Sequence, residues 1–529
     1  MIARVKSSTL VGIDAVPVDV ECVVLPGQLP MFSIVGLPDT SGREGAVRVR
    51  SALKAIGHGV PLKRVTVNLA PADLRKHGSA LDLAIALSIL IGDGSYDGAE
   101  LDSVLVLGEL GLDGSIRPVR GVLAAAMLAK KRGLRGVLVP DASAAEALLV
   151  EEIEVYAARH LSEAVAALQG EPMPLPTQEG GRRRRWRGFS VDMADVRGQA
   201  YARRAIEVAV AGGHNLLLSG PPGTGKTMLA RRIPTVLPAM TRAEALETTK
   251  VYSSLGLAHG LIEDRPFRAP HHTVSGAALL GGGAAPRPGE ISLAHNGVLF
   301  LDELPEFARG TLEALRQPLE DRAITIGRVH GTIHLPASFL LVAAANPCPC
   351  GWAHSGVREC QCSQSAIDRY RARLSGPLLD RIDLQVSVQP VSLAALRDDQ
   401  PAEASAVIRE RVALARERQR ARLARWDLAC NAEMPAAVLR TCCPLSDACE
   451  RELVELVEER RSLSARSIDR ILKVARTLAD LDGHEAISPD DLREAARYRA
   501  VDPVTELAGP PPDPSLVQPR VVPPQGVPS

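Results

Sequence analysis

The pattern of hydrophobic and polar positions divides the chain into three folded parts. Residues 1–170 mix strand-like runs such as Val18–Leu25 with alanine-rich helical stretches such as Val122–Lys131. A glycine-rich series of strands and helices follows at 191–391, and a helical pattern with interspersed charges covers 392–502. We therefore expect an α/β protein, with a doubly wound parallel sheet in the central part, an α+β domain before it and a helical domain after it.

Two segments lack a periodic apolar face and are expected to lie outside the folded parts. Residues 171–190 are rich in Pro, Gly and Arg and include the run Arg182–Arg187, which predicts a basic linker. This run either contacts nucleic acid or is a solvated linker with no ligand. Residues 503–529 are rich in proline and predict an extended or disordered tail.

The composition fits a folded protein and excludes several classes. Hydrophobic residues make up 46% of the 529 residues, which excludes wholesale disorder. The 62 Lys and Arg balance the 62 Asp and Glu, which excludes a uniformly basic nucleic-acid binder but not a local basic channel. No apolar run reaches the roughly 20 residues of a membrane helix, and no secretory signal opens the chain. We expect a cytoplasmic protein with no membrane partner.

A phosphate-binding loop marks the central part. The segment Gly220–Thr227 lies between an apolar strand, Asn215–Ser219, and a helical run that begins near Met228. Glycines let backbone N–H groups close around phosphates, and the amino terminus of the helix favours an anion. Lys226 is then expected to reach the β- and γ-phosphates of ATP, and the Thr227 hydroxyl to bind Mg²⁺. The residues of this candidate site are Gly220, Pro221, Pro222, Gly223, Thr224, Gly225, Lys226 and Thr227.

Two later strands end in polar groups suited to ATP hydrolysis. The apolar strand Val298–Leu301 is followed by Asp302 and Glu303. Asp302 is expected to complete the Mg²⁺ shell, and Glu303 to act as the general base on the attacking water. Asn346 follows the apolar strand Phe339–Ala345, where its amide is expected to orient that water.

Two arginines are candidates for stabilising phosphate charge. Arg381 lies in the otherwise apolar stretch Leu378–Leu384. It either stabilises transition-state charge on the nucleotide of a neighbouring subunit, or forms a salt bridge with Asp380 or Asp383. Arg466 lies at the start of a predicted helix, where it either senses the γ-phosphate or belongs to a solvated helix face.

Four of the nine cysteines are clustered in the sequence. They form two Cys-x-Cys pairs separated by nine residues: Cys348 and Cys350, then Cys360 and Cys362. Four thiolates in a short loop are able to enclose a structural Zn²⁺, although these pairs are tighter than the usual ligand spacing. The alternatives are reduced, partly buried thiols and, less in keeping with the compartment, a disulfide.

The stretch 323–334 alternates around a glycine-containing turn and predicts a β-hairpin. Arg328 and His330 lie at its tip. They either contact DNA phosphates, which gives sequence-independent and salt-sensitive binding, or belong to a surface hairpin that has no ligand.

Together these motifs resemble the AAA+ ATPases, and three segments resemble more closely the family of Mg-chelatase-like ATPases. These segments are Arg265–Ser275, Pro288–Gly297 and Asn346–Gly351. The resemblance covers about residues 1–502. It implies an AAA+ core, an amino-terminal Lon-like domain of the ribosomal S5 domain 2-like fold, and a helical C-terminal lid.

The resemblance also implies roles for the site residues and a partner. It assigns phosphate and Mg²⁺ binding to Lys226 and Thr227, hydrolysis to Asp302 and Glu303, sensor 1 to Asn346, a finger acting on the neighbouring subunit to Arg381, and sensor 2 to Arg466. It implies a homohexameric ring that threads single-stranded or branched DNA and drives branch migration on recombination intermediates, as in natural transformation. In related DNA motors the hairpin before the sensor-1 strand lies in the pore.

Two alternative functions share the same core. The first is a magnesium-chelatase-type motor subunit that remodels a partner protein, although such subunits usually lack a Lon-like domain. The second is an ATP-dependent protease with a Ser–Lys pair. By alignment with the Lon segments, the nucleophile position falls on Ala80 and the lysine position on Leu123, so both chemical groups are missing and we expect no protease activity.

Overall fold

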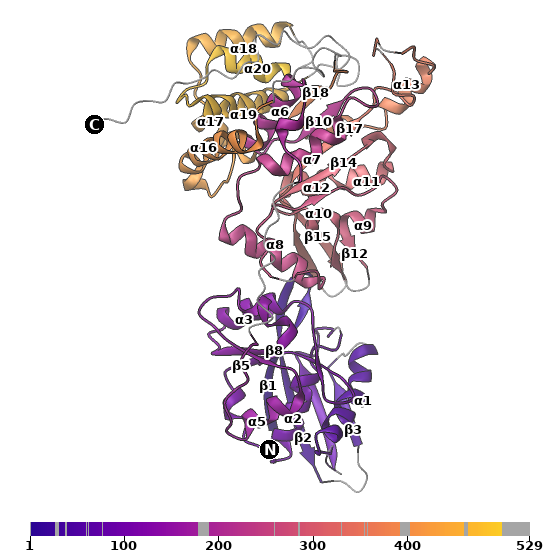
Figure 1. Cartoon of the computed structure of the whole chain (residues 1–529), viewed down its shortest axis with the longest axis vertical. Coiled ribbons are helices and arrows are strands. Elements are labelled where there is room, and N and C mark those ends of the chain that lie inside the picture. Colours follow the sequence, from indigo (N-terminus) through magenta and orange to yellow (C-terminus); the bar gives the residue numbers. More distant parts are fainter. Residues whose placement is uncertain are drawn as a thin grey trace, which may run out of the picture.

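The computed structural model of this chain has two lobes joined end to end (Figure 1). The elements between residues 2 and 168 form one lobe, and those between residues 193 and 497 form the other. The structure describes residues 2–26, 31–36, 40–59, 61, 63–76, 78–177, 190–258, 260–283, 286–328, 331–353, 355–356, 358–391, 402–459 and 464–499. Most of the predicted linker, His330 and the predicted tail therefore lie outside the described residues.

The amino-terminal lobe is built on a seven-stranded mixed sheet. In sheet order, the strands are β3 (Met31–Val35), β4 (Arg64–Ala70), β2 (Asp14–Leu25), β1 (Ile2–Val11), β5 (Val104–Val106), β8 (Gly136–Pro140) and β9 (Glu154–Ala158). The longer helices are α1 (Thr40–Ala55), α2 (Asp82–Gly92), α3 (Val122–Lys131) and α5 (Leu161–Leu168). Every residue of α2 is buried because this helix packs on β1 and β2. Its one charged side chain, Asp82, is paired with Arg48 at 2.6 Å.

The central part is built on a five-stranded parallel sheet. Its order is β11 (Phe267–Arg268), β14 (Val298–Leu301), β17 (Leu340–Ala345), β10 (Leu216–Ser219) and β18 (Leu384–Ser387). Helices α6 (Ala200–Gly212) and α7 (Lys226–Val236) cover one face, and α8 (Arg242–Ser254), α10 (Glu290–Leu293) and α11 (Arg309–Ala314) cover the other.

Successive residues of β10 show how both faces of this sheet are buried. Leu216 and Leu218 belong to the apolar cluster that contains α6 and α7, whereas Leu217 belongs to the cluster that contains α8 and α10. A parallel sheet buried on both faces is what the apolar runs of the sequence predict. The parallel α/β core is therefore confirmed.

Two β-hairpins extend this core. The first pairs β12 (Gly281–Gly282) with β13 (Arg287–Pro288), and the second pairs β15 (Ala323–Arg328) with β16 (Gly331–Pro336). The second is the hairpin predicted from the sequence, and it directly precedes β17 in the chain. Figure 1 shows both hairpins at the end of the core that faces the amino-terminal lobe.

The C-terminal part is helical, as predicted. Its longer helices are α16 (Ser405–Leu423), α17 (Ala436–Cys442), α18 (Asp447–Glu459), α19 (Ala465–Asp482) and α20 (Pro489–Arg497). Helices α16 and α19 pack on α6 of the core. The fully buried carboxylate of Asp480 joins them, because it contacts Arg422 at 2.6 Å and Arg476 at 3.0 Å.

The two lobes contact each other through α8 and the turn between β1 and β2. Helix α3 packs on α8, and the N–H of Gly121 donates to the carbonyl of Ser253 at 3.0 Å. Ile13, in the β1–β2 turn, belongs to the same buried apolar cluster as Leu335 of β16. The amino-terminal lobe therefore rests on the base of the second hairpin.

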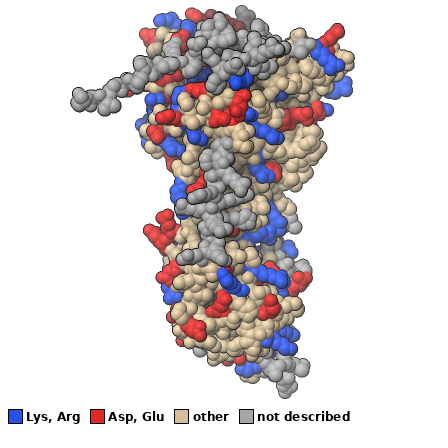
Figure 2. Space-filling view, viewed as in Figure 1, with Lys and Arg blue, Asp and Glu red and all other residues tan. Residues whose placement is uncertain are grey.

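The surface carries both signs of charge. Figure 2 shows Lys, Arg, Asp and Glu side chains interspersed over one face of both lobes. This distribution agrees with the formal net charge of zero. Among the described helices, none combines the length and the apolar character needed to cross a bilayer.

Candidate nucleotide-binding site

The predicted nucleotide-binding groups gather where three neighbouring strands end. The loop Gly220–Thr227 follows β10, Asp302 and Glu303 follow β14, and Asn346 follows β17. Because these strands are parallel and adjacent, their carboxyl ends bring the groups to one edge of the sheet. Helix α7 begins at Lys226, so the unpaired N–H groups of its first turn face the same space.

Lys226 is held inside the loop by oxygen atoms. Its Nζ donates to the carbonyls of Gly220 at 2.7 Å and Pro221 at 2.8 Å, and to Oδ1 of Asn346 at 3.2 Å. Burial lowers the pKa of Lys226 to about 8, although the carboxylates of Asp302 and Glu303 oppose the shift. An ammonium group poor in anionic partners and surrounded by oxygens suits a phosphate, which supplies both oxygen atoms and negative charge.

Thr227 and Asp302 fit a Mg²⁺ ion that accompanies the nucleotide. The Thr227 hydroxyl donates to Oδ2 of Asp302 at 2.7 Å, so a hydroxyl and a carboxylate, both ligands that Mg²⁺ accepts, lie side by side. The loop itself leaves room for phosphates. Gly223 has a φ of +79°, and a Cβ atom built there meets no atom within 4 Å, so this glycine lines an open cradle.

Glu303 is held in a left-handed backbone conformation. Its φ is +53°, its N–H donates to Oδ1 of Asp302 at 3.0 Å, and its Oε2 lies 3.3 Å from Nδ1 of His272. A non-glycine residue with positive φ stores strain, which functional sites tolerate more than other places. From the sequence, the pair His271–His272 was expected to serve in structural hydrogen bonding, so the position of His272 beside Glu303 was not predicted.

Gln199 is a second residue of the site that no sequence motif indicates. It precedes α6 and has a φ of +57°. Its Nε2 donates to the carbonyls of Thr224 at 3.2 Å and Gln389 at 2.6 Å, so it ties the phosphate loop to the segment after β18. An isolated glutamine more than 20 residues before the loop gives no sequence signal.

Arg381 lies near the amino-terminal ends of the sheet strands, whereas Lys226 lies at their carboxyl-terminal ends. Its carbonyl accepts a hydrogen bond from Nδ2 of Asn215 at 2.9 Å, and Asn215 immediately precedes β10. Lys226 follows the other end of β10, and the length of this strand alone is about 10 Å. Arg381 is therefore remote from the phosphate loop of its own chain.

The ion pair of Arg381 is formed with neither of the two aspartates next to it in the sequence. Its guanidinium contacts Glu320 of α12 (Arg316–Asp321) at 2.5 Å and donates to the carbonyl of Pro377 at 2.6 Å. Asp383 is instead paired with Arg470 of α19. The alternative left open by the sequence, a salt bridge from Arg381 to Asp380 or Asp383, is replaced by the pair with Glu320, because α12 brings a carboxylate that the local sequence does not reveal.

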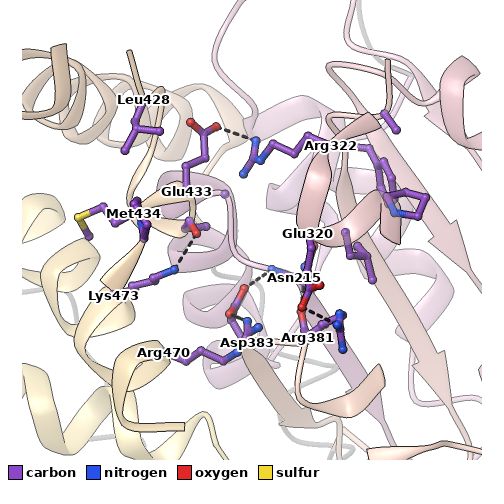
Figure 3. Close-up of a pocket in the computed structure, with 17 residues that line it drawn as sticks. Asn215, Glu320, Arg322, Arg381, Asp383, Leu428, Glu433, Met434, Arg470 and Lys473 are labelled. Carbon is purple, nitrogen blue, oxygen red and sulfur yellow. Dashed lines mark hydrogen bonds and ion pairs between the residues drawn. The ribbon is translucent and has the colours of Figure 1, made fainter. Parts of the chain in front are cut away.

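A cavity of about 460 Å³ opens beside Arg381 (Figure 3). Its charged lining residues are Arg322, Arg381, Arg470, Lys473, Glu320, Asp383 and Glu433. Three ion pairs use three of the cations, including the pair of Arg322 with Glu433 at 2.6 Å. The fourth, Lys473, donates to the carbonyl of Ala432 at 3.1 Å, and burial lowers its pKa. The cavity is therefore polar, with one more cation than anions.

Arg466 forms no hydrogen bond or ion pair with the described phosphate loop of its own chain. It is exposed in the first turn of α19, and it makes no hydrogen bond or ion pair to another described residue. The helix contacts the core instead through Arg470, one turn further on, at the edge where Arg381 lies.

The predicted DNA-contacting residues are described in part. The backbone of Arg328 pairs with Gly331 at the end of β15 and β16, and His330 lies outside the described residues. The structure does bring together all four cysteines of the predicted zinc site. The other five cysteines, Cys22, Cys430, Cys442, Cys443 and Cys449, are buried and unbonded to sulfur.

The two positions that correspond to the Lon catalytic pair lie in apolar packing. Leu123, on α3, is fully buried, and Ala80 packs against the same apolar cluster. Ser79 instead donates to a carboxylate oxygen of Glu109. The amino-terminal lobe places hydrocarbon where that protease chemistry needs a nucleophile and a base.

The site has a phosphate loop at the end of one parallel strand and acidic residues at the end of a neighbouring strand. Together with the appended helical part, this arrangement is that of a P-loop ATPase of the AAA+ class. Family models for subunit ChlI of magnesium chelatase match three segments of this chain. The model described as "Magnesium chelatase, subunit ChlI" matches residues 192–396, "Subunit ChlI of Mg-chelatase" matches 20–143, and "Magnesium chelatase, subunit ChlI C-terminal" matches 402–499.

Individual relatives agree over nearly the whole length. The chain is 42% identical to the uncharacterized protein YifB of Escherichia coli (strain K12) over 508 residues, which cover 94% of this chain and 97% of YifB. It is 43% identical to competence protein ComM of Haemophilus influenzae over 507 residues, which cover 94% of this chain and 98% of ComM. The chain belongs to this family of YifB- and ComM-type Mg-chelatase-like ATPases. A shorter match, 29% identical over 181 residues, links 29% of the chain to 32% of Lon protease 2 of Bacillus subtilis.

Proposed function

We propose that this chain is an ATP-driven ring motor that translocates on DNA and moves branch points in recombination intermediates. Membership of this family supports ATP and Mg²⁺ as the nucleotide and metal of this chain. The name of the relative ComM, competence protein, links that relative to competence. In this proposal, residues 1–170, 191–391 and 392–502 act as the Lon-like, AAA+ and lid domains of each copy. The motor works in the cytoplasm, where chromosomal DNA is found.

The residues at the carboxyl edge divide the work of hydrolysis. When bound, Mg²⁺ would neutralise phosphate charge, and Thr227 and Asp302 are the residues that would hold it. Lys226 exchanges its oxygen partners for phosphate oxygens. Glu303 accepts the proton of the attacking water while His272 and its own backbone fix the direction of its carboxylate. Asn346, next to Lys226, orients that water.

The observation that carries the proposal is the separation of Arg381 from its own phosphate loop. An arginine at the amino-terminal ends of the strands contributes to hydrolysis only if it faces the nucleotide of another copy. This requirement supports an oligomer in which each ATP lies between two subunits, and a closed ring is the usual outcome of such head-to-tail contacts. Glu320 holds Arg381 until the more highly charged phosphates of a neighbour compete for it.

The proposal that DNA is the polymer rests on the second hairpin. It leaves the core directly before β17, the strand that ends just before Asn346, so a movement of the hairpin reaches the hydrolysis site through one strand. Arg328 at its end supplies the positive charge for a phosphate backbone. Arg466 and the cavity beside Arg381 are proposed to face the neighbouring subunit's nucleotide.

DNA-stimulated ATP hydrolysis tests this proposal. We expect single-stranded DNA to raise the rate of the unmodified protein, and Arg328→Ala to weaken this effect and to lower the salt slope of binding by about one. Arg132→Ala, which removes an exposed arginine of the amino-terminal lobe, is the matched control. A rate that is indifferent to DNA would favour the alternative, a chelatase-type motor that remodels a partner protein, which the family models of magnesium chelatase also support.

A further inference from the structure

The four clustered cysteines converge from the two ends of the loop between β17 and α13. Their Sγ atoms all lie within 4.8 Å of one another. Cys348 lies 3.3 Å from Cys350 and 3.7 Å from Cys360, and Cys350 lies 3.6 Å from Cys360. No two of these cysteines are bonded to each other.

These separations match a tetrahedral site for a single ion. Four sulfurs at the usual Zn–S distance of about 2.3 Å from a central zinc lie about 3.8 Å apart. The N–H of Ala353 donates to Sγ of Cys348 at 3.3 Å, which is the type of bond that supports a metal-bound thiolate. Cys348 is buried and the other three cysteines are half-buried, as expected of a closed structural site rather than an open catalytic one.

The same loop touches the phosphate loop. Gly351 has a φ of +84°, and a Cβ atom there would lie 2.6 Å from Cγ of Pro222. The loop also begins two residues after Asn346, whose side chain accepts from Lys226. The four thiols therefore enclose a segment that contacts the phosphate loop at Pro222 and that begins two residues after Asn346.

The other end of the loop leads into a helix beside the hydrolysis residues. Ser363, the residue after Cys362, accepts from the N–H of Ala366 and caps α13 (Gln364–Arg371). Ile367 of this helix packs on the cysteine cluster. Tyr370, one turn further, lines a small cavity together with Asn346.

We propose that Cys348, Cys350, Cys360 and Cys362 bind one structural Zn²⁺, and that this ion holds the loop against Pro222 so that Asn346 and Lys226 keep their positions. The zinc site is thus a support of the nucleotide site. This inference is separate from the DNA activity proposed above, because metal content and ATP binding are measured without DNA.

The first test is metal content of the full chain purified without added metal or chelator. We expect about one zinc per chain by elemental analysis. The double variant Cys360→Ser/Cys362→Ser is expected to hold none, and Cys442→Ser, which alters a buried cysteine outside the cluster, is expected to keep it. Replacement of zinc by Co²⁺ is expected to give the intense visible absorption of a tetrahedral thiolate site. Absence of zinc with no uptake of added Zn²⁺, or iron in its place, would overturn the assignment.

The second test separates the support role from metal binding itself. Gly351→Ala retains all four thiols but drives a methyl group into Pro222. We expect it to keep its zinc and to lose about a hundredfold in ATP hydrolysis, the scale that a displacement of about 1 Å costs a catalytic site. Gly356→Ala is the control, because this glycine has a similar positive φ in the same loop and a Cβ atom there meets no atom within 4 Å. Normal hydrolysis by Gly351→Ala would overturn the coupling.

A third measurement uses the unmodified protein, in case the serine variants do not fold. Titration with a mercurial thiol reagent is expected to release the zinc, which a zinc-sensitive dye detects. Over the same range of reagent concentration, it is expected to weaken binding of a fluorescent ATP analogue. Removal of the reagent and addition of Zn²⁺ is expected to restore binding. ATP affinity that stays constant while all the zinc is released would contradict the support role.

Discussion

Lys226 and Arg381 lie at opposite ends of the strands of one sheet. The Lys226 of one copy is therefore expected to work with the Arg381 of an adjacent copy. The perturbation is a pair of single substitutions, Lys226→Ala and Arg381→Ala. Loss of an arginine that acts across a subunit boundary costs about a thousandfold or more in rate. Each variant alone is therefore expected to be inactive. Both are expected to fold, because Lys226 bonds to the carbonyls of Gly220 and Pro221 and to Oδ1 of Asn346, all at the nucleotide site, and the partner of Arg381, Glu320, is 55% exposed.

The magnitude for a mixture of the two variants follows from this arrangement. A subunit boundary is intact when Lys226 comes from an Arg381→Ala copy and Arg381 comes from a Lys226→Ala copy. Random assembly of equal amounts gives this combination at about one quarter of the boundaries. If the boundaries act independently, the mixture recovers about one quarter of the unmodified rate in a coupled ATPase assay after subunit exchange.

A matched control uses the double variant. Lys226→Ala mixed with Lys226→Ala/Arg381→Ala has no intact boundary and is expected to stay inactive. The account is refuted if the two single variants form mixed oligomers, verified by cross-linking of tagged copies, and recover no hydrolysis. It is refuted equally if Arg381→Ala alone hydrolyses ATP at the full rate.

Three further predictions concern single residues. Glu303→Gln is expected to bind ATP normally but to hydrolyse it roughly a hundredfold more slowly or worse in single-turnover assays. His272→Ala is expected to lose less of the hydrolysis rate. Equal rates for Glu303→Gln and the unmodified chain would exclude the role of Glu303 as general base. Burial lowers the pKa of Lys226 to about 8, so ATP affinity measured by calorimetry is expected to fall by up to about tenfold per pH unit above pH 8; an affinity that is constant from pH 8 to 9 would contradict this. Arg470→Ala leaves the buried Asp383 without its cation and is expected to cost about 3 kcal/mol in the free energy of unfolding at pH 7. Burial alone raises the pKa of Asp383, but Arg470, His214 and the N–H of Asn215 together outweigh it and the pKa is lowered. The stability from these partners is therefore present above the usual carboxyl pKa of about 4 and is lost as the pH falls below it. A change below about 1 kcal/mol in denaturant unfolding at pH 7 would contradict the prediction.

The parts of the site that lie on single strands could be predicted from the sequence. An apolar run followed at once by a polar residue indicates a buried strand end, and this pattern correctly located β14 before Asp302 and β17 before Asn346. The phosphate loop was predictable for the same reason, since it lies between a strand and a helix that are adjacent in the chain. The hairpin β15–β16 followed from its alternation.

Contacts between distant segments could not be predicted. His272 reaches Glu303 only because β11 lies beside β14 in the sheet, and no local pattern reports that neighbour. The pairing of Arg381 with Glu320 depends on the placement of α12, whereas the sequence showed only the two aspartates next to the arginine. Convergence of the four cysteines likewise required the fold of a loop that has no periodic pattern.

We propose that ATP hydrolysis at these subunit boundaries moves DNA. The most direct test is a branch-migration assay on labelled three-strand and four-way DNA substrates, with Lys226→Ala as the control for the nucleotide site. We predict that the unmodified protein converts both substrates in an ATP- and Mg²⁺-dependent reaction, and that Lys226→Ala converts neither. An unmodified protein that hydrolyses ATP at full rate but leaves both substrates unchanged would contradict the account.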